Sequence, residues 1–249
     1  KKNLISIIIP YHRKKKYFQQ TIHSIVKQSY KNYEVIIIFD DTSLTDLDFV
    51  KKAIKIFKKK KLIVNKKNLG VAKSRNIALK NSKGSYVAFI DADDLWKKNK
   101  LKNQIKFMKK TSCDFSFTSY SIVDEKNTFI KERNVFFDAD YQSLIKSNYI
   151  GLNTVVVNKK ILSHLSFPNL RTQEDFAVWL KLCRKGIKLR HLSETLSCWR
   201  KTENSLSSNT LIKIFDAFKL FYFYEKKNFI FSIYSVIVLS YNKLLKNYF

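Results

Sequence analysis

Residues 85–94, Ser-Tyr-Val-Ala-Phe-Ile-Asp-Ala-Asp-Asp, join an apolar run to three carboxylates within four residues. The apolar run is typical of a buried strand, and the acids that follow it would then lie at the edge of a sheet, where ligands bind. Carboxylates so close together repel one another unless a cation lies between them, and oxygen ligands suit Mg²⁺ and Mn²⁺. Alternatively, Asp93 and Asp94 cap a helix that begins near Trp96, since Asp is a favoured N-cap residue. These residues alone leave both interpretations open.

Three apolar runs upstream of this stretch alternate with helical patterns. A run at 4–9, ended by Pro10, a second at 35–39 and a short one at 62–64 each predict a buried strand. Apolar stripes at helical spacing predict helices between them, and Gly70 supplies a permissive backbone just before the third helix. This alternation is typical of an α/β fold in which a mostly parallel central sheet is flanked by helices.

Two of the predicted strands end in neighbouring acids. Asp40 and Asp41 follow the second strand, and the acids of 91–94 follow the fourth. Because the carboxyl ends of parallel strands lie on one side of an open sheet, both groups are expected to face one crevice. The sequence therefore predicts one ligand site built from segments that are far apart in the chain.

The pattern is less regular in the second half of the chain. A stripe of Leu101, Ile105 and Met108 predicts one more helix, and a later stripe predicts a helix that follows 173–175 and is closed by Gly186. Short strands, some of them antiparallel, are expected at 115–117, 120–123, 153–157 and 196–199.

The tail differs in character, because residues 228–242 carry no charge. This stretch is shorter than the roughly 20 residues that a membrane-spanning helix needs. Lysines bracket it and tyrosines lie along it, namely Lys226, Lys227, Lys243, Lys246, Tyr222, Tyr224, Tyr234, Tyr241 and Tyr248. These features predict an amphipathic helix lying at a membrane interface. The alternative is a helix packed on the domain or on a second subunit.

Composition narrows the choice of partners and compartment. The chain of 249 residues is large enough for a full core, and its formal net charge of +28 suggests an anionic partner. Only seven of the 48 basic residues are arginine, and the lysines are dispersed, which disfavours nucleic acid and leaves an anionic membrane surface open. The three cysteines form no CxxC pair and no leader peptide is evident, so a cytoplasmic protein is expected, peripheral at the inner face of the membrane.

Together these segments resemble glycosyltransferase family 2, whose members have the GT-A fold and move a sugar from a nucleotide to an acceptor. The matching segments follow the family's order and lie at 6–11, 28–37, 40–41, 68–70, 74–76, 91–94 and 174–180. The resemblance implies a GT-A domain at 1–207, with a nucleotide-binding half at about 1–110 and an acceptor half at 111–207. A C-terminal helical tail at 208–249 would follow it.

The resemblance also implies an activity. A bacterial inverting enzyme of this family would transfer a sugar from a nucleotide-sugar donor, expected to be UDP-linked, to a hydroxyl of a saccharide or lipid-linked acceptor in polysaccharide biosynthesis. Mn²⁺ or Mg²⁺ would stabilise the charge that develops on the leaving nucleotide. Two other hypotheses stay open: a sugar-phosphate nucleotidyltransferase, although residues 10–13 contain no glycine for a phosphate loop, and a non-catalytic basic module that binds nucleic acid or lipid.

Individual residues of the donor site follow from the same resemblance. Asp93 is the expected metal ligand, and Asp91 would reach the ribose or the ion. Asp41 matches the acid that binds the base of the nucleotide, and Arg75 would either neutralise phosphate or brace the metal-binding acids. The other residues expected in the donor site are Pro10, Tyr11, Gly70 and Ala92.

Asp175 matches the family's general base, which takes a proton from the acceptor hydroxyl. Alternatively, Asp175 and the adjacent Glu174 only favour the N-terminal turn of their helix, where negative charge meets the positive end of the dipole. The chain departs from the family at two places. No Asn follows Tyr11, and Thr202 stands where relatives often have a His that completes the metal shell.

Overall fold

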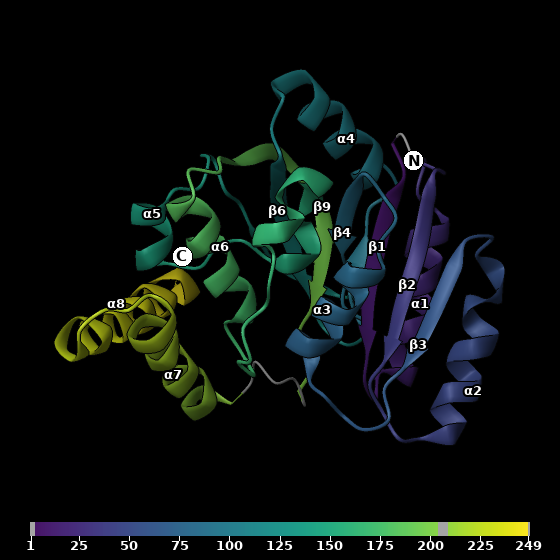
Figure 1. The fold of residues 1–249 in the computed structure, drawn as a ribbon, viewed down its shortest axis with the longest axis horizontal. Helices are drawn as coiled ribbons and strands as arrows, with labels where there is room; N and C mark the ends of the chain where they lie inside the picture. The colour runs from purple at the N-terminus through teal and green to yellow at the C-terminus, as the bar shows by residue number, and fades with distance from the viewer. Residues whose placement is uncertain (1–2, 204–208, 249) are drawn as a thin grey trace.

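The computed structural model describes residues 3–203 and 209–248, apart from the side chains of Lys243 and residues 246–248. Its strands are β1 (Ile5–Tyr11), β2 (Tyr33–Phe39), β3 (Lys60–Val64), β4 (Tyr86–Phe89), β5 (Leu95–Trp96), β6 (Phe115–Val123), β7 (Phe129–Arg133), β8 (Val156–Asn158) and β9 (Leu189–Arg200). They form one mixed sheet in the order β3-β2-β1-β4-β8-β6-β9-β5, with β7 added on β6 (Figure 1).

The helices connect and cover this sheet. They are α1 (Lys15–Val26), α2 (Leu44–Ala53), α3 (Val71–Asn81), α4 (Lys100–Thr111), α5 (Tyr141–Lys146), α6 (Glu174–Arg184), α7 (Thr210–Lys219) and α8 (Phe229–Tyr248). Short 3₁₀ turns lie at η1 (Ile54–Ile56), η2 (Leu152–Thr154) and η3 (Lys159–His164), and a π-helix, η5 (Leu220–Tyr224), follows α7.

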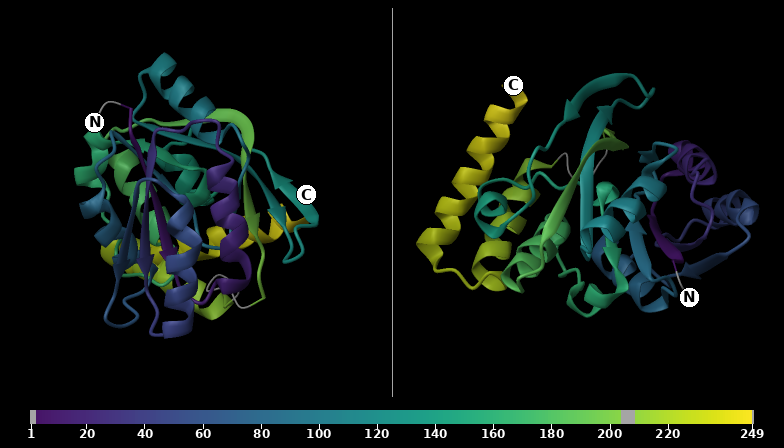
Figure 2. Two further views of the ribbon diagram at one scale, coloured as in Figure 1. Left: turned by 90° about the vertical axis from the view of Figure 1, so that its right-hand side faces the viewer. Right: turned by 90° about the horizontal axis from the view of Figure 1, so that it is seen from above.

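The first half is the predicted parallel α/β unit. β1 pairs in parallel with β2 and β4, and β2 pairs in parallel with β3. Helices α1, α2 and α4 cover one face of these strands, and α3 covers the other (Figure 2). Alternate residues of β1 enter the two layers: Ile5, Ile7 and Ile9 pack with the first group of helices, whereas Ile8 packs with α3. Because both faces of these strands are buried, their sequences read as continuous apolar runs.

The second half is mixed, and three strand predictions change there. β8 runs antiparallel to β4 and β6, whereas β9 runs parallel to β6. The runs at 115–117 and 120–123 form the single strand β6, η2 delays the start of β8 to Val156, and the strand expected at 196–199 is only the end of β9. Much of β9 is partly exposed, so its sequence lacks the apolar run that would have predicted its beginning.

The first strand continues through Pro10, where the sequence predicted its end. Pro10 pairs with Ile38 in the parallel ladder of β1 and β2. The carbonyl oxygen of Ile8 points toward β4 and accepts a hydrogen bond from the N–H of Ile90. Pro10 is two residues further along β1, so its backbone also points to the β4 side. It lies past Ile8, the last residue of β1 that pairs with β4. The missing N–H of proline therefore removes no hydrogen bond from the residue pairs that join β1 to β4.

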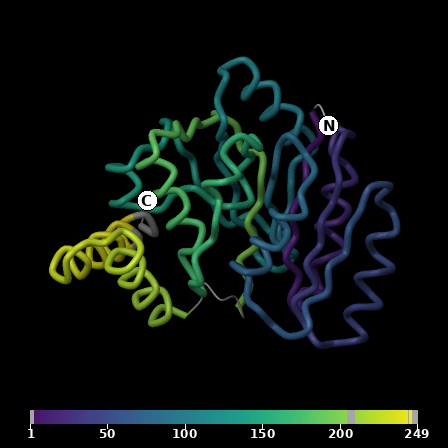
Figure 3. The backbone as a smooth tube through the Cα atoms, in the orientation of Figure 1, coloured from purple at the N-terminus to yellow at the C-terminus, as the bar shows by residue number. Residues whose placement is uncertain are grey.

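The tail packs beside α5 and α6 (Figure 3). Leu220 and Phe221 are fully buried, Ser232 and Ser235 lie on the packed face of α8, and the side-chain amide of Asn242 donates to the carbonyl oxygen of Lys146 at 2.8 Å. One face of α8 thus packs on the domain, as the alternative to a membrane-interface helix predicted. Its other face is exposed. Within the described residues, no helix is long and apolar enough to span a membrane.

Candidate active site

The acids of 91–94 diverge at the end of β4. The capping interpretation is wrong, because β5 follows these acids directly and α4 begins only at Lys100. Asp94 turns into the protein, where it accepts hydrogen bonds from the backbone N–H of Arg200 at 2.9 Å and from the amide of Asn153 at 2.7 Å. Burial, and then the charges of the neighbouring acids, raise the pKa of Asp94 well above its ordinary value. Asp94 is therefore a structural acid, whereas Asp91 keeps 40% of its side chain exposed.

Asp93 meets a cation of the chain itself. The ammonium of Lys14 lies 2.6 Å from Oδ2 of Asp93 and 3.4 Å from the hydroxyl oxygen of Thr202. Burial raises the pKa of Asp93, and the charge of Lys14 opposes this effect. Lys14 thus lies between the expected metal ligand and the position where the family often has a His.

Arg75 bridges the two halves of the site. One terminal nitrogen donates to Oδ1 of Asp91 at 2.7 Å, and the other donates to Oε1 of Glu174. The guanidinium also lies over the ring of Phe167, 5.6 Å from its centroid. Burial alone would lower the pKa of Arg75, but the two carboxylates raise it above its ordinary value. The structure shows Arg75 in contact with Asp91, as the bracing role predicts, but its second partner is Glu174 rather than Asp93. The role in neutralising phosphate stays a prediction.

Asp175 lies in the first turn of α6, next to this bridge. Its Oδ1 accepts a hydrogen bond from the N–H of Phe176 at 2.7 Å, and part of its surface stays exposed. Burial, and then the charge of Glu174, raise the pKa of Asp175 to about 7, although Arg75 lowers it. Both acids begin α6, so the helix-terminus interpretation also holds. A carboxyl group with a pKa near neutrality is nevertheless suited to take a proton at physiological pH.

The other acid pair performs two different tasks. Asp41 accepts hydrogen bonds from the N–H groups of Thr42 and Ser43, and His12 lies 3.5 Å from its Oδ2. Burial would raise the pKa of Asp41, but these N–H groups and His12 hold it below its ordinary value. Only 2% of the Asp41 side chain is exposed. Tyr11 does not share this position: its ring is fully buried and its hydroxyl donates to Asp46 at 2.7 Å. The side chain expected to contact nucleotide therefore lies in the core.

Asp40, which the sequence predicted to face the crevice with Asp41, fixes the loop before α3. It accepts from the N–H of Leu69 at 2.7 Å, from the N–H of Gly70 at 2.8 Å and from the amide of Asn65 at 2.7 Å. Gly70 has a φ of +86°, a conformation that favours glycine. Residues of the second strand end thereby position the N-terminus of α3, and with it Arg75.

Arg200 and Asn153 are further residues that sequence reasoning missed. Arg200 is 1% exposed, and its Nε donates to the backbone oxygen of Asp93 at 2.8 Å. Its guanidinium lies over the ring of Tyr17 at 4.8 Å and donates to the side-chain oxygen of Gln20 at 2.8 Å. The one signal in the sequence was that Arg200 belongs to the segment containing Thr202, of which residues 204–207 lie outside the described part of the chain.

The carboxylates of Asp91 and Asp93 fit a divalent cation in their chemistry, since Mg²⁺ and Mn²⁺ prefer oxygen ligands. One oxygen of each is already bonded to a cation of the chain, Arg75 or Lys14. Among residues 3–203 and 209–248, no group of three or more His, Cys, Asp or Glu side chains could hold a metal ion.

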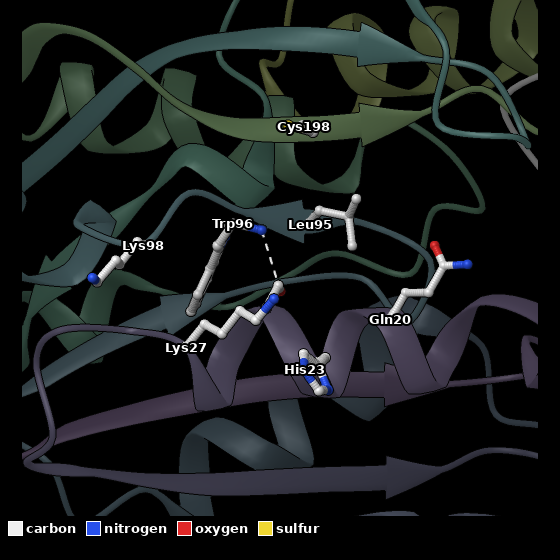
Figure 4. A pocket seen from close by; sticks show the side chains of 8 residues that line it. Gln20, His23, Lys27, Leu95, Trp96, Lys98 and Cys198 are labelled. Atoms are coloured by element: carbon white, nitrogen blue, oxygen red, sulfur yellow. Dashed lines mark hydrogen bonds between the residues drawn. The ribbon is translucent and has the colours of Figure 1, made fainter.

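A separate cavity of about 580 Å³ lies between α1 and β5 (Figure 4). Its lining includes His23, Lys27 and Trp96 but none of the predicted site residues. Two lining residues are near the acids: Gln20 accepts the hydrogen bond from Arg200, and Leu95 directly follows Asp94. The chemistry of the carboxylates thus lies outside this cavity.

Comparison with known proteins identifies the family. The model of glycosyl transferase family 2 matches residues 6–165. One relative is TuaG of Bacillus subtilis, which is named provisionally as a glycosyltransferase of teichuronic acid biosynthesis. The two sequences are 36% identical, and the aligned part covers 84% of this chain and 83% of TuaG. WfaP of Escherichia coli, named a UDP-Glc:alpha-D-GlcNAc-diphosphoundecaprenol beta-1,3-glucosyltransferase, is 36% identical over 83% of this chain and 80% of its own. This chain belongs to glycosyltransferase family 2, and it is a glycosyltransferase.

Solved structures agree on the fold. TarS of S. aureus in complex with UDP-GlcNAc matches with a TM-score of 0.71 at 22% identity, over 87% of this chain and 66% of that one. The mannosyltransferase PcManGT of Pyrobaculum calidifontis, in complex with GDP-Man and Mn²⁺, matches with a TM-score of 0.68 at 16% identity, over 90% of this chain and 64% of that one. The predicted GT-A fold is confirmed. This chain spans about two thirds of either structure.

Proposed function

We propose that this chain is an inverting glycosyltransferase in which Asp175 is the general base. The observation that carries the proposal is that Arg75 donates hydrogen bonds to both Asp91 and Glu174. Its guanidinium thereby connects the expected diphosphate side to the helix turn that holds Asp175. With its pKa near 7, Asp175 would take the proton from the acceptor hydroxyl as that oxygen attacks the anomeric carbon. The bond from sugar to diphosphate breaks on the opposite face, and the nucleoside diphosphate leaves with the negative charge.

The donor we propose is a UDP-sugar, with Asp41 accepting a hydrogen bond from the base. WfaP is named for a UDP-glucose donor, and the TarS structure holds UDP-GlcNAc, which supports this choice. A divalent cation, Mn²⁺ or Mg²⁺, would be held by Asp93 and Asp91 and would stabilise the charge on the leaving diphosphate. The PcManGT complex contains Mn²⁺, which supports a cation in general. Pro10, Gly70 and Ala92 lie on segments that would border the donor.

The acceptor we propose is a hydroxyl of a lipid-linked saccharide. WfaP is named for a diphosphoundecaprenol acceptor, which supports this class, and TuaG is named for teichuronic acid biosynthesis. Such an acceptor lies at a membrane surface, and the exposed face of α7 and α8 offers apolar side chains for peripheral contact: Leu211, Phe215, Ile230, Ile233, Tyr234, Ile237, Tyr241 and Leu244. The surrounding lysine excess would attract anionic headgroups.

The donor proposal is tested by a thermal-shift panel of nucleoside diphosphates with Mn²⁺, with Mg²⁺ and with EDTA. We expect UDP with Mn²⁺ to give the largest rise in melting temperature, and Asp41→Asn to reduce it. Transfer from a UDP-sugar to a synthetic lipid-linked acceptor should then be abolished by Asp175→Asn with UDP binding retained. Asp175→Asn with wild-type transfer would remove Asp175 from the base role.

Membrane contact is tested by co-sedimentation with vesicles of phosphatidylglycerol or of phosphatidylcholine. We expect binding to the anionic vesicles, weakened by the double variant Ile230→Ser and Ile237→Ser. The double variant Leu44→Ser and Ile56→Ser is the matched control, because it removes exposed apolar side chains far from α8. Equal loss in both variants would argue against a docking face on α8.

A further inference from the structure

Lys14 differs from the two lysines that follow it. The ammonium of Lys15 lies over the ring of Phe49, and that of Lys16 pairs with Glu125 at the surface. The Lys14 side chain instead turns inward, is 24% exposed, and reaches Asp93 at 2.6 Å. The direction of Lys14 is therefore a specific contact rather than a consequence of the basic run.

The two partners of Lys14 are largely buried, so this contact differs from an ion pair at the surface. Asp93 keeps 12% of its side chain exposed, and Thr202, whose hydroxyl lies 3.4 Å from the ammonium, is 6% exposed. An ammonium carries three donors and can meet a carboxylate and a hydroxyl at once. A hydroxyl is a matching acceptor for an ammonium, whereas a neutral imidazole at position 202 would be a metal ligand.

The charges of the acid cluster are already compensated within the chain. Arg75 pairs with Asp91, Lys14 pairs with Asp93, and Asp94 is satisfied by hydrogen bonds from Arg200 and Asn153. The repulsion that the sequence suggests would require an external cation is thus relieved by the chain's own side chains. A divalent cation that bonds Oδ2 of Asp93 must therefore compete with Lys14.

We propose that Lys14 is the resident cation of the Asp93 site: its ammonium holds the position between Asp93 and Thr202, and a divalent cation binds there only by displacing it. This inference rests on the proposed function, because it takes Asp93 as the metal ligand. Its consequence is that metal affinity in this chain is set by a competing side chain. The site then holds a positive charge at all times, first as ammonium and then as metal ion.

The test is the affinity for Mn²⁺ alone, measured from the electron paramagnetic resonance signal of the free ion. Lys14→Met should lower the dissociation constant about tenfold, the ratio expected when a competing contact of about 1.4 kcal/mol is removed. Lys16→Met is the matched control, since it removes the same charge two residues away, and it should change the constant less than twofold. Lys14→Arg keeps the charge and should keep affinity near that of the wild type.

Two outcomes would overturn the inference, and they are distinguishable. Equal effects of Lys14→Met and Lys16→Met, with Asp93→Asn still weakening Mn²⁺ binding, would leave the metal role of Asp93 intact and remove Lys14 from the site. Unchanged Mn²⁺ binding in Asp93→Asn would instead refute the metal assignment of the proposed function, and the inference about Lys14 with it. Circular dichroism of each variant separates these results from misfolding.

Discussion

Replacing Asp175 by Asn should stabilise the protein while it abolishes transfer. Burial, and then Glu174, raise the pKa of Asp175 from 3.8 to about 7, so the native state holds this proton more tightly than the unfolded chain does. The ionised carboxylate therefore destabilises the native state, and the free energy of unfolding falls as pH rises from about 4 to about 7. The Asp175→Asn variant lacks this titration.

The size of the effect follows from the same pKa. One pKa unit corresponds to about 1.4 kcal/mol, which sets an upper limit of about 4 kcal/mol for the gain in the free energy of unfolding at pH 8. Because Asp175 keeps part of its surface exposed, solvent screening reduces this gain, and we expect about 1–2 kcal/mol. Below about pH 4 the carboxyl group is protonated in both states, so the variant and the wild type should be equally stable there.

Urea denaturation of both proteins at pH 4 and at pH 8 measures this difference. Asp48→Asn is the control, because its carboxyl is 69% exposed and pairs with Lys51 of the same helix. In parallel, the kcat/KM of the wild type should rise with pH through an apparent pKa near 7. A gain of the same size at both pH values, or no gain at pH 8, would show that Asp175 is not the strained acid that the structure describes.

Two further predictions concern the segments that position Asp175. Arg75→Met leaves Glu174 buried without its cation, so the free energy of unfolding should fall by about 3–5 kcal/mol in urea denaturation. Because Arg75 lowers the pKa of Asp175, the acid limb of the remaining activity should also move to higher pH. Gly70→Ala places a Cβ at a φ of +86° with open space around it, so we expect a loss of about 1 kcal/mol from backbone strain alone; an unchanged urea midpoint would contradict this.

The parallel half of the fold could be predicted from the sequence because its information is local. The strands at 35–39 and 86–89 are buried on both faces, so each appears in the sequence as an apolar run. The acids that follow each strand are adjacent to it in the chain. The second half could not be predicted as well. β9 is only partly buried and pairs with β6 through register shifts, and neither feature leaves a periodic pattern.

The same distinction applies to the site. Asp91, Asp93 and Asp175 belong to recognisable segments, whereas the contact of Lys14 with Thr202 joins residues that are 188 positions apart. Arg200 likewise reaches the backbone of Asp93 from the far end of the domain. A run of three lysines predicts a solvated surface, and nothing in it distinguishes the one lysine that turns inward. Contacts of this kind become visible only when the strand ends are placed in space.

Helix α3 connects the strand end that holds Asp91 to the helix turn that holds Asp175, the proposed base. At the N-terminus of α3, the N–H of Gly70 donates to Asp40. Further along the helix, Arg75 donates hydrogen bonds to Asp91 and Glu174. The next residue, Asn76, exchanges two hydrogen bonds with the backbone of the segment before α6, at 2.8 and 2.9 Å. In-line displacement requires the base and the leaving group on opposite sides of one carbon, and a misplacement of about 1 Å can cost about a hundredfold in rate. A single helix that contacts both halves through consecutive residues would hold the proposed base and the proposed diphosphate side in one fixed relation.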